Sequence, residues 1–170
     1  GMTWEELRHA VGEIGDLTPH LVSAERVSVL ALGRPHGDSP DEAALSAVLR
    51  SLERSHDMVV VDLGDGARLA ELGRRAVPLL MVGADVRSVA AARMRARRID
   101  LTGALLVVRA GKGRGLPPEA VSDALGLPLA GVVRDDPRVP RLAAQGASVG
   151  SRPAARLRRD STRLLKEVRL

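Results

Sequence analysis

The sequence contains no cysteine, no phenylalanine and no tyrosine, and Trp4 is its single aromatic residue. Without cysteine the chain has no disulfide, no thiolate metal ligand and no cysteine nucleophile. Because aromatic side chains are almost absent, a core must be built from aliphatic residues, and stacking recognition of single-stranded nucleic acid is disfavoured. No apolar run approaches the roughly 20 residues that a membrane-spanning helix needs. We therefore expect a cytoplasmic protein with an aliphatic core.

The remaining composition is that of a globular protein. Hydrophobic residues make up 45% of the 170 residues and charged residues 28%, which favours a folded chain over a disordered one. The formal net charge is +5, and residues 152–170 carry all of it, because seven basic side chains there face two acidic ones. We expect one domain over residues 1–170, which ends in a basic helix over residues 152–170.

Five apolar runs have the length of strands. Most are continuous rather than alternating, which is typical of strands covered on both faces in a parallel sheet. The runs are Val27–Leu32, Met58–Leu63, Pro78–Ala84, Ala104–Val108 and Leu127–Val133.

Helix signals alternate with these runs. Ser39 before Pro40, with Glu42 three positions after the serine, has the pattern of a capping box. Alternation of strands and helices predicts an α/β fold, with a doubly wound, mainly parallel sheet and helices on both faces. The other expected helices begin at Thr3, span Ala67–Ala76 and Val86–Ile99, begin at Pro117 and at Asp136-Pro137, and follow a Ser151 cap.

Charged residues follow four of the expected strands. Asp62 follows the apolar residues 58–61 within its run, Asp85 and Arg109 each come directly after a run, and Arg134-Asp135-Asp136 follows another. Ligands of open parallel sheets bind at the carboxyl ends of the strands, so these side chains are candidates for a binding site. For Asp85 and Asp136 a second interpretation stays open, in which each only caps the helix that follows.

Asp62 has the context of a Walker B carboxylate, because four apolar residues precede it and a glycine-containing loop follows. Such a carboxylate orients Mg²⁺ against nucleotide phosphates. The partner motif GxxxxGK[ST] has no match in the chain. The glycine-rich loop 111–115 carries Lys112, but Gly113 stands where the motif needs Ser or Thr. We therefore predict that the chain alone has no ATPase activity.

Taken in order, these segments resemble the C-terminal part of the MinD/ParA-type (deviant Walker) ATPases. More narrowly, they are similar to the septum-site-determining, CpaE-like proteins of bacteria. The similarity spans nearly all residues and begins downstream of the family's phosphate loop. The segments that carry it are Gly1–Leu7, Val27–Leu30, Val59–Leu63, Leu79–Arg87, Leu106–Arg109 and Gly131–Asp136 with Gln145-Gly146.

The resemblance implies a P-loop NTPase-like fold from which the first strand and the phosphate loop are absent. Complete members bind ATP and Mg²⁺ and form homodimers that position the division septum or a pilus or secretion apparatus, attached to membrane or nucleoid. By that similarity Asp62 would face the metal, and Arg109, Arg134 and Asp136 would lie beside the nucleotide. Two alternatives stay open: a non-catalytic partner-binding module, or a DNA- or membrane-associated adaptor of the same fold.

Two basic stretches allow two interpretations each. Residues 152–170 form either the last packing helix of the domain, with arginine stems along its edge, or an amphipathic helix on a membrane surface. Residues 93–98 form either a solvated helix face or a patch that contacts the DNA backbone.

Overall fold

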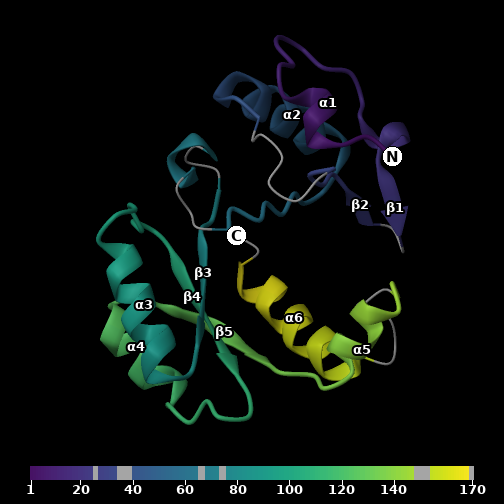
Figure 1. The fold of residues 1–170 in the computed structure, drawn as a ribbon. Helices are drawn as coiled ribbons and strands as arrows, with labels where there is room; N and C mark the ends of the chain where they lie inside the picture. Colours follow the sequence, from purple (N-terminus) through teal and green to yellow (C-terminus); the bar gives the residue numbers. More distant parts are fainter. Residues whose placement is uncertain (25–26, 34–39, 65–67, 73–75, 148–153, 169–170) are drawn as a thin grey trace. The chain divides into compact units, whose positions relative to one another are not determined.

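The computed structural model describes residues 1–24, 27–33, 40–64, 68–72, 76–147 and 154–168 (Figure 1). The chain divides into two compact units, Gly1–Leu72 and Gly73–Leu170. That all 170 residues make up one domain stays a prediction, and each unit has its own core.

The first unit is built from short elements around one longer helix. The fully buried Val48 of helix α2 packs with Leu7, Leu17 and Leu21, and these four side chains form a small aliphatic core. The elements are α1 (Trp4–Leu7), the 3-10 turn η1 (Thr18–His20), β1 (Val22–Ala24), β2 (Val27–Val29), α2 (Glu42–Ser55) and the 3-10 turn η2 (Leu69–Leu72).

Helix α2 begins later than its sequence signal suggests. The Asp41 carboxylate accepts a hydrogen bond from the backbone N–H of Ala44 at 2.7 Å, so Asp41 is the N-cap and Glu42 the first helical residue. The predicted cap, Ser39, lies outside the described residues. Aspartate and serine can both accept a hydrogen bond from a free N–H group at a helix start. Because Ser39 and Asp41 both precede the helix, the sequence alone does not decide between them.

Two predictions about strands in the first unit are wrong. The run that begins at Val27 forms a three-residue strand, and it pairs antiparallel with β1 rather than joining a parallel sheet. Only two residues separate β1 from β2, and such a short connection can join antiparallel strands but not parallel ones.

The segment 58–63, which was expected to form a central strand before Asp62, has no strand structure. Its Val60 side chain is 83% exposed. A strand exists through hydrogen bonds to a neighbour, so an apolar run predicts one only where a partner strand is available.

The second unit has the predicted α/β architecture. Its parallel sheet has the order β3-β4-β5, and a helix lies in each crossover. Helices α3 and α4 lie on one side of the sheet and α6 on the other (Figure 1). The elements are β3 (Leu79–Gly83), α3 (Val86–Ala96), β4 (Leu105–Ala110), α4 (Pro118–Leu125), β5 (Leu129–Arg134), α5 (Val139–Ala144) and α6 (Ala155–Val168).

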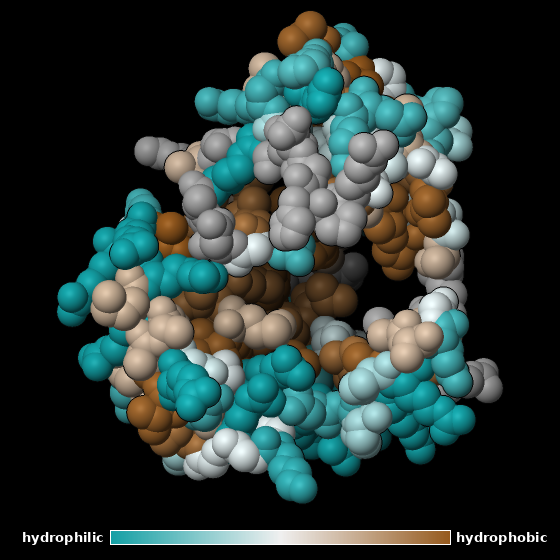
Figure 2. All heavy atoms as spheres, viewed as in Figure 1, coloured by the Kyte–Doolittle hydropathy of each residue, from teal (hydrophilic) through white to brown (hydrophobic). Residues whose placement is uncertain are grey.

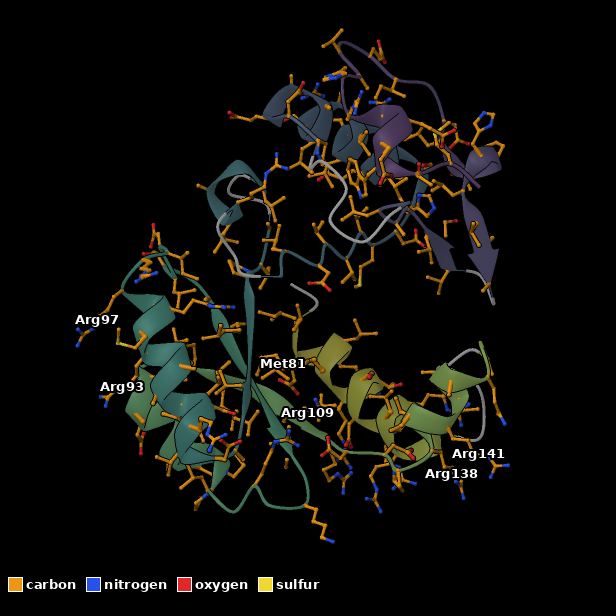
Figure 3. All side chains as sticks on the ribbon, viewed as in Figure 1. Met81, Arg93, Arg97, Arg109, Arg138 and Arg141 are labelled. Carbon is orange, nitrogen blue, oxygen red and sulfur yellow. The ribbon has the colours of Figure 1, made fainter. Side chains whose placement is uncertain are left out.

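The middle strand β4 forms the centre of this core. Leu106, Val107 and Val108 are fully buried on successive positions, which means that both faces of β4 are covered, as the continuous apolar run predicted. The edge strand β3 is less covered: Met81 is 59% exposed, and Figure 3 shows it near the middle of the strand.

The register brings the carboxyl ends of all three strands to one edge. Gly83 of β3 pairs with Arg109 of β4, and Ala110 pairs with Arg134 of β5. Backbone hydrogen bonds continue past the strands, from Ala84 N to Arg109 O at 3.0 Å and from Asp135 N to Ala110 O at 2.8 Å. The charged residues that follow these strands are therefore held on a well-ordered backbone.

Candidate functional site

Three of the four predicted site residues lie at this common edge. Arg109, Arg134 and Asp136 all come from the carboxyl ends of β4 and β5, as the sequence predicted. Asp62 belongs to the first unit. Its carboxylate accepts a hydrogen bond from Gly64 N at 2.9 Å, which is a local turn contact. A role of Asp62 toward Mg²⁺ stays a prediction, and the described residues contain no group of three metal-ligating side chains.

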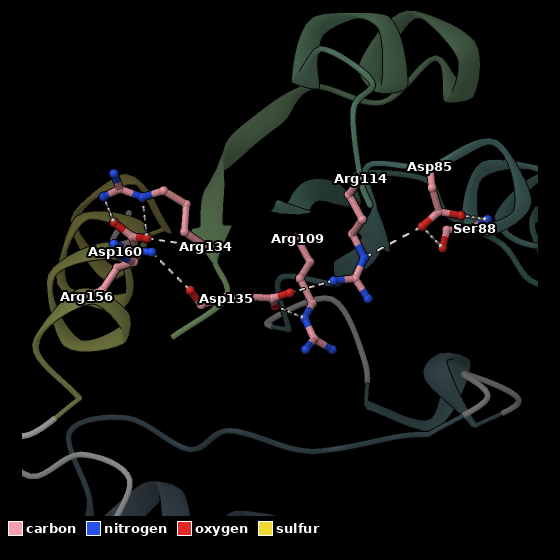
Figure 4. Close-up of polar contacts among 8 residues, drawn as sticks. All are labelled: Asp85, Ser88, Arg109, Arg114, Arg134, Asp135, Arg156 and Asp160. Atoms are coloured by element: carbon pink, nitrogen blue, oxygen red, sulfur yellow. Dashed lines mark hydrogen bonds and ion pairs between the residues drawn. The ribbon is translucent and has the colours of Figure 1, made fainter. Parts of the chain in front are cut away.

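Four side chains form a chain of ion pairs, which we call the rim cluster: Asp85, Arg109, Arg114 and Asp135 (Figure 4). Arg109 Nε and Arg114 Nη1 each donate to a different oxygen of the Asp135 carboxylate at 2.7 Å. Arg114 Nε lies 3.6 Å from Asp85 Oδ2, which is too long for a hydrogen bond but within ion-pair range.

Asp85 anchors one end of the rim cluster and also caps α3. Its carboxylate accepts hydrogen bonds from the backbone N–H and the hydroxyl of Ser88, both at 2.8 Å. The Ser88 backbone N–H is the main cause that lowers the pKa of Asp85, with the Ser88 hydroxyl next and Arg114 adding to it. Asp85 therefore caps α3 as one interpretation of the sequence predicted, but its ion pair with Arg114 means that capping is not its only contact.

Asp135 joins the two arginines of the rim cluster. The hydrogen bond from Arg109 is the main cause that lowers its pKa. Both carboxylate oxygens accept from arginines, which favours the charged form of Asp135 and makes it a poor proton acceptor. The Arg109 side chain is 53% exposed, so this guanidinium can also face a ligand at the strand ends.

The sequence did not single out Arg114, which the glycine-rich loop carries back to the sheet. The loop turns through a hydrogen bond from Arg114 N to Gly111 O at 3.0 Å. A Cβ atom at Gly111 would overlap the Asp135 carboxylate. The close approach of Asp135 explains why position 111 is a glycine. From the sequence we could say only that the loop lacks the phosphate-loop pattern.

A second group surrounds the start of α6. Arg134 Nη2 donates to Asp160 Oδ1 at 2.6 Å, and Arg134 Nε and N both donate to Asp160 Oδ2 at 3.0 Å. Asp160 is 3% exposed, and the hydrogen bond from Arg134 is the main cause that lowers its pKa. The sequence treated Asp160 only as a negative charge in a basic segment, because no local signal marks a partner 26 residues away.

Asp136 belongs to this second group, and the prediction that it starts the next helix is wrong. Helix α5 begins at Val139, and its N-cap is Arg138, without a side-chain cap. The Asp136 carboxylate instead accepts from Arg138 N at 3.0 Å and from Arg156 N in the first turn of α6 at 3.2 Å. The Arg138 hydrogen bond is the main cause that lowers its pKa. Asp136 therefore supports a helix that is distant in sequence.

The structure thus divides the predicted site into two neighbouring groups. Arg109 is part of the rim cluster, whereas Arg134 and Asp136 contact α6. Arg156 Nη1 donates to the backbone oxygen of Asp135 at 3.4 Å and links the two groups (Figure 4).

The two basic stretches have clear positions. Helix α6 packs against β5, where Leu164 approaches Gly131, as the packing interpretation of residues 152–170 predicts. The predicted cap Ser151 lies outside the described residues. Arg93 on α3 and Arg97, the C-cap residue of this helix, are exposed and point away from the sheet (Figure 3). Contacts of either stretch with membrane or DNA stay predictions.

No protein-family model, curated protein or solved structure is significantly similar to the chain. Among the helices of the described residues, none combines the length and the apolar character needed to cross a membrane.

Proposed function

We propose that this chain is a nucleotide-associated domain of the MinD/ParA type that acts in positioning cell-division or pilus and secretion machinery. In this proposal the three-stranded sheet is part of a doubly wound, P-loop NTPase-like fold. The supporting observation is that β3, β4 and β5 run parallel and carry charged side chains at one edge, in the order that the resemblance implies.

The chemistry of that edge fits a nucleotide. Nucleotides bind outside the carboxyl ends of parallel strands, where side chains from neighbouring strands converge. Arg109 is half exposed there, and a guanidinium can stack on a base or donate to phosphate oxygens. Asp135 accepts a hydrogen bond from Arg109 Nε and orients this side chain, while Arg114 holds the other oxygen of the same carboxylate.

Calorimetric titration of the full chain with ATP and Mg²⁺ tests the proposal. We expect saturable binding that Arg109→Ala weakens by about tenfold, which corresponds to the loss of one charged contact. Arg93→Ala is the matched control, because it removes the same charge from the exposed face of α3. Absence of binding, or equal binding by both variants, would overturn the proposal.

A specific observation favours a second candidate function, a non-catalytic module of the same fold. The Asp135 carboxylate is paired with two arginines, and the Asp85 carboxylate is paired with Arg114 and caps α3. Neither is therefore available as a base or as a metal ligand. On this proposal the chain releases no phosphate from ATP. Turnover that Asp62→Ala abolishes and the nearby control Asp57→Ala preserves would refute it.

A further inference from the structure

We propose that a hollow beside the start of α6 binds a phosphate group, a function separate from nucleotide binding at the rim cluster. The hollow has a volume of about 370 Å³. Arginines dominate its lining, and the visible surface around α5 carries hydrophilic residues beside hydrophobic ones (Figure 2). We call it the arginine pocket and define it by Arg134, Asp136, Pro137, Arg138, Arg156 and Arg159.

The charge balance of the arginine pocket favours an anion. Four guanidinium groups line it against a single carboxylate, that of Asp136. This carboxylate is engaged by the backbone N–H groups of Arg138 and Arg156. Asp160, which lies beneath Arg134, neutralises one of the four arginines. Four arginines set against Asp136 and Asp160 leave a formal charge of +2 around the pocket, which favours an anion.

The geometry favours phosphate among anions. Arg156 is held by a hydrogen bond from its side chain to Asp135 O at 3.4 Å, and its backbone N–H by Asp136. Within the described residues Arg159 has no hydrogen bond or ion pair, so its donors are open to a ligand. Several guanidinium groups around one concave site match the multiple oxygens and the double charge of a phosphate monoester or phosphoanhydride.

The pocket also lies beside the N-terminal turn of a 14-residue helix, α6. The Asp136 carboxylate already caps this turn through the Arg156 N–H, so the arginine side chains rather than the helix end supply the positive potential for a ligand. The phosphate could come from a soluble compound or from the headgroup of an anionic lipid, and both sources present the same chemistry to the pocket.

The experiment uses inorganic pyrophosphate with the full chain, in calorimetric titrations at constant ionic strength. We expect saturable binding that the double variant Arg138→Ala/Arg159→Ala weakens at least about tenfold. The matched control Arg93→Ala/Arg97→Ala removes the same net charge from α3 and should bind as the unchanged chain does. A second measurement guards against misfolding: pyrophosphate should raise the thermal unfolding midpoint of the unchanged and control chains but not of the pocket variant.

A parallel arm distinguishes the two sources of phosphate. The chains are sedimented with vesicles of phosphatidylcholine alone and with vesicles that also contain phosphatidylglycerol. Binding to the anionic vesicles that is lost in the pocket variant but kept in the control identifies a lipid headgroup, and pyrophosphate binding identifies a soluble phosphate. Either result supports the pocket. Equal losses in both double variants, or no binding in either arm, would overturn it.

This test separates the pocket from the rim cluster. Arg109→Ala should leave pyrophosphate binding unchanged, because Arg109 does not line the pocket. ATP binding that is weaker in Arg109→Ala, with pyrophosphate binding intact, would support both proposals independently.

Discussion

At the scale of single residues, the strand ends are organised by a few close contacts that local sequence does not reveal. Asp135 is held from two directions by Arg109 and Arg114, and its carboxylate occupies the space that a side chain at position 111 would fill. Gly111 of the loop 111–115 is thus needed for the close approach of Asp135. In the sequence the three glycines of this loop look alike, so the role of Gly111 could not be predicted.

The contact at Gly111 makes a prediction about stability. We expect Gly111→Ala to destabilise the fold by about 2 kcal/mol, because the added methyl group has to displace the Asp135 carboxylate and its two arginine partners. Gly115→Ala is the matched control in the same loop, since a Cβ atom there meets no neighbour within 4 Å. Urea unfolding followed by circular dichroism measures both, and equal midpoints would contradict the close approach.

At the scale of elements, an apolar run forms a strand where a neighbouring strand is available to pair with it. Pro78–Ala84, Ala104–Val108 and Leu127–Val133 match β3, β4 and β5, because each has a neighbour in a sheet and a helix to cover it. Residues 58–63 are as apolar, yet they form no strand. Helix starts were predicted well at Asp85 and Pro117, whereas α5 begins at Val139 rather than at Asp136, whose carboxylate contacts Arg156 N of α6.

Helix α2 allows a test of its cap. Asp41→Ala removes the acceptor for Ala44 N, so we expect the thermal unfolding midpoint to fall by about 3 °C. Asp41→Ser keeps an oxygen at the same place, and it should recover most of the loss. If Asp41→Ser is as unstable as Asp41→Ala, the loss arises from the Asp41 ion pair with His9 at 3.6 Å rather than from the cap.

At the scale of the whole molecule, several lowered carboxylate pKa values link stability to pH. Asp85, Asp135 and Asp160 each have a pKa below their ordinary 3.8, because hydrogen bonds favour their charged forms. A depressed folded-state pKa contributes stability that is fully present above the unfolded pKa. That contribution is lost as pH falls from about 4 through the lower folded-state values.

We therefore expect the second unit to lose stability in acid. The variant Asp160→Asn should show how much of that loss depends on the ion pair between Asp160 and Arg134. The variant should be less stable at pH 7, where the charged pair is lost, and its stability should fall less steeply below pH 4. Asp123→Asn is the control, because Asp123 is exposed on α4. Denaturant unfolding at pH 7, 5 and 3 measures the effect, and parallel pH profiles for both variants would contradict it.

The sequence by itself determined the aliphatic core, the parallel strands of the second unit and the presence of charged residues at their ends. These follow from local composition: continuous apolar runs, helix starts and the polarity of each strand end. Only the tertiary structure decided that residues 58–63 stay outside a sheet and that the rim cluster forms. It also decided that Asp136 caps the first turn of α6 and that Asp160 of α6 pairs with Arg134 of β5. The physical reason is that strand pairing, ion pairing and distant capping depend on which segments meet in space, and a linear sequence does not specify those partners directly.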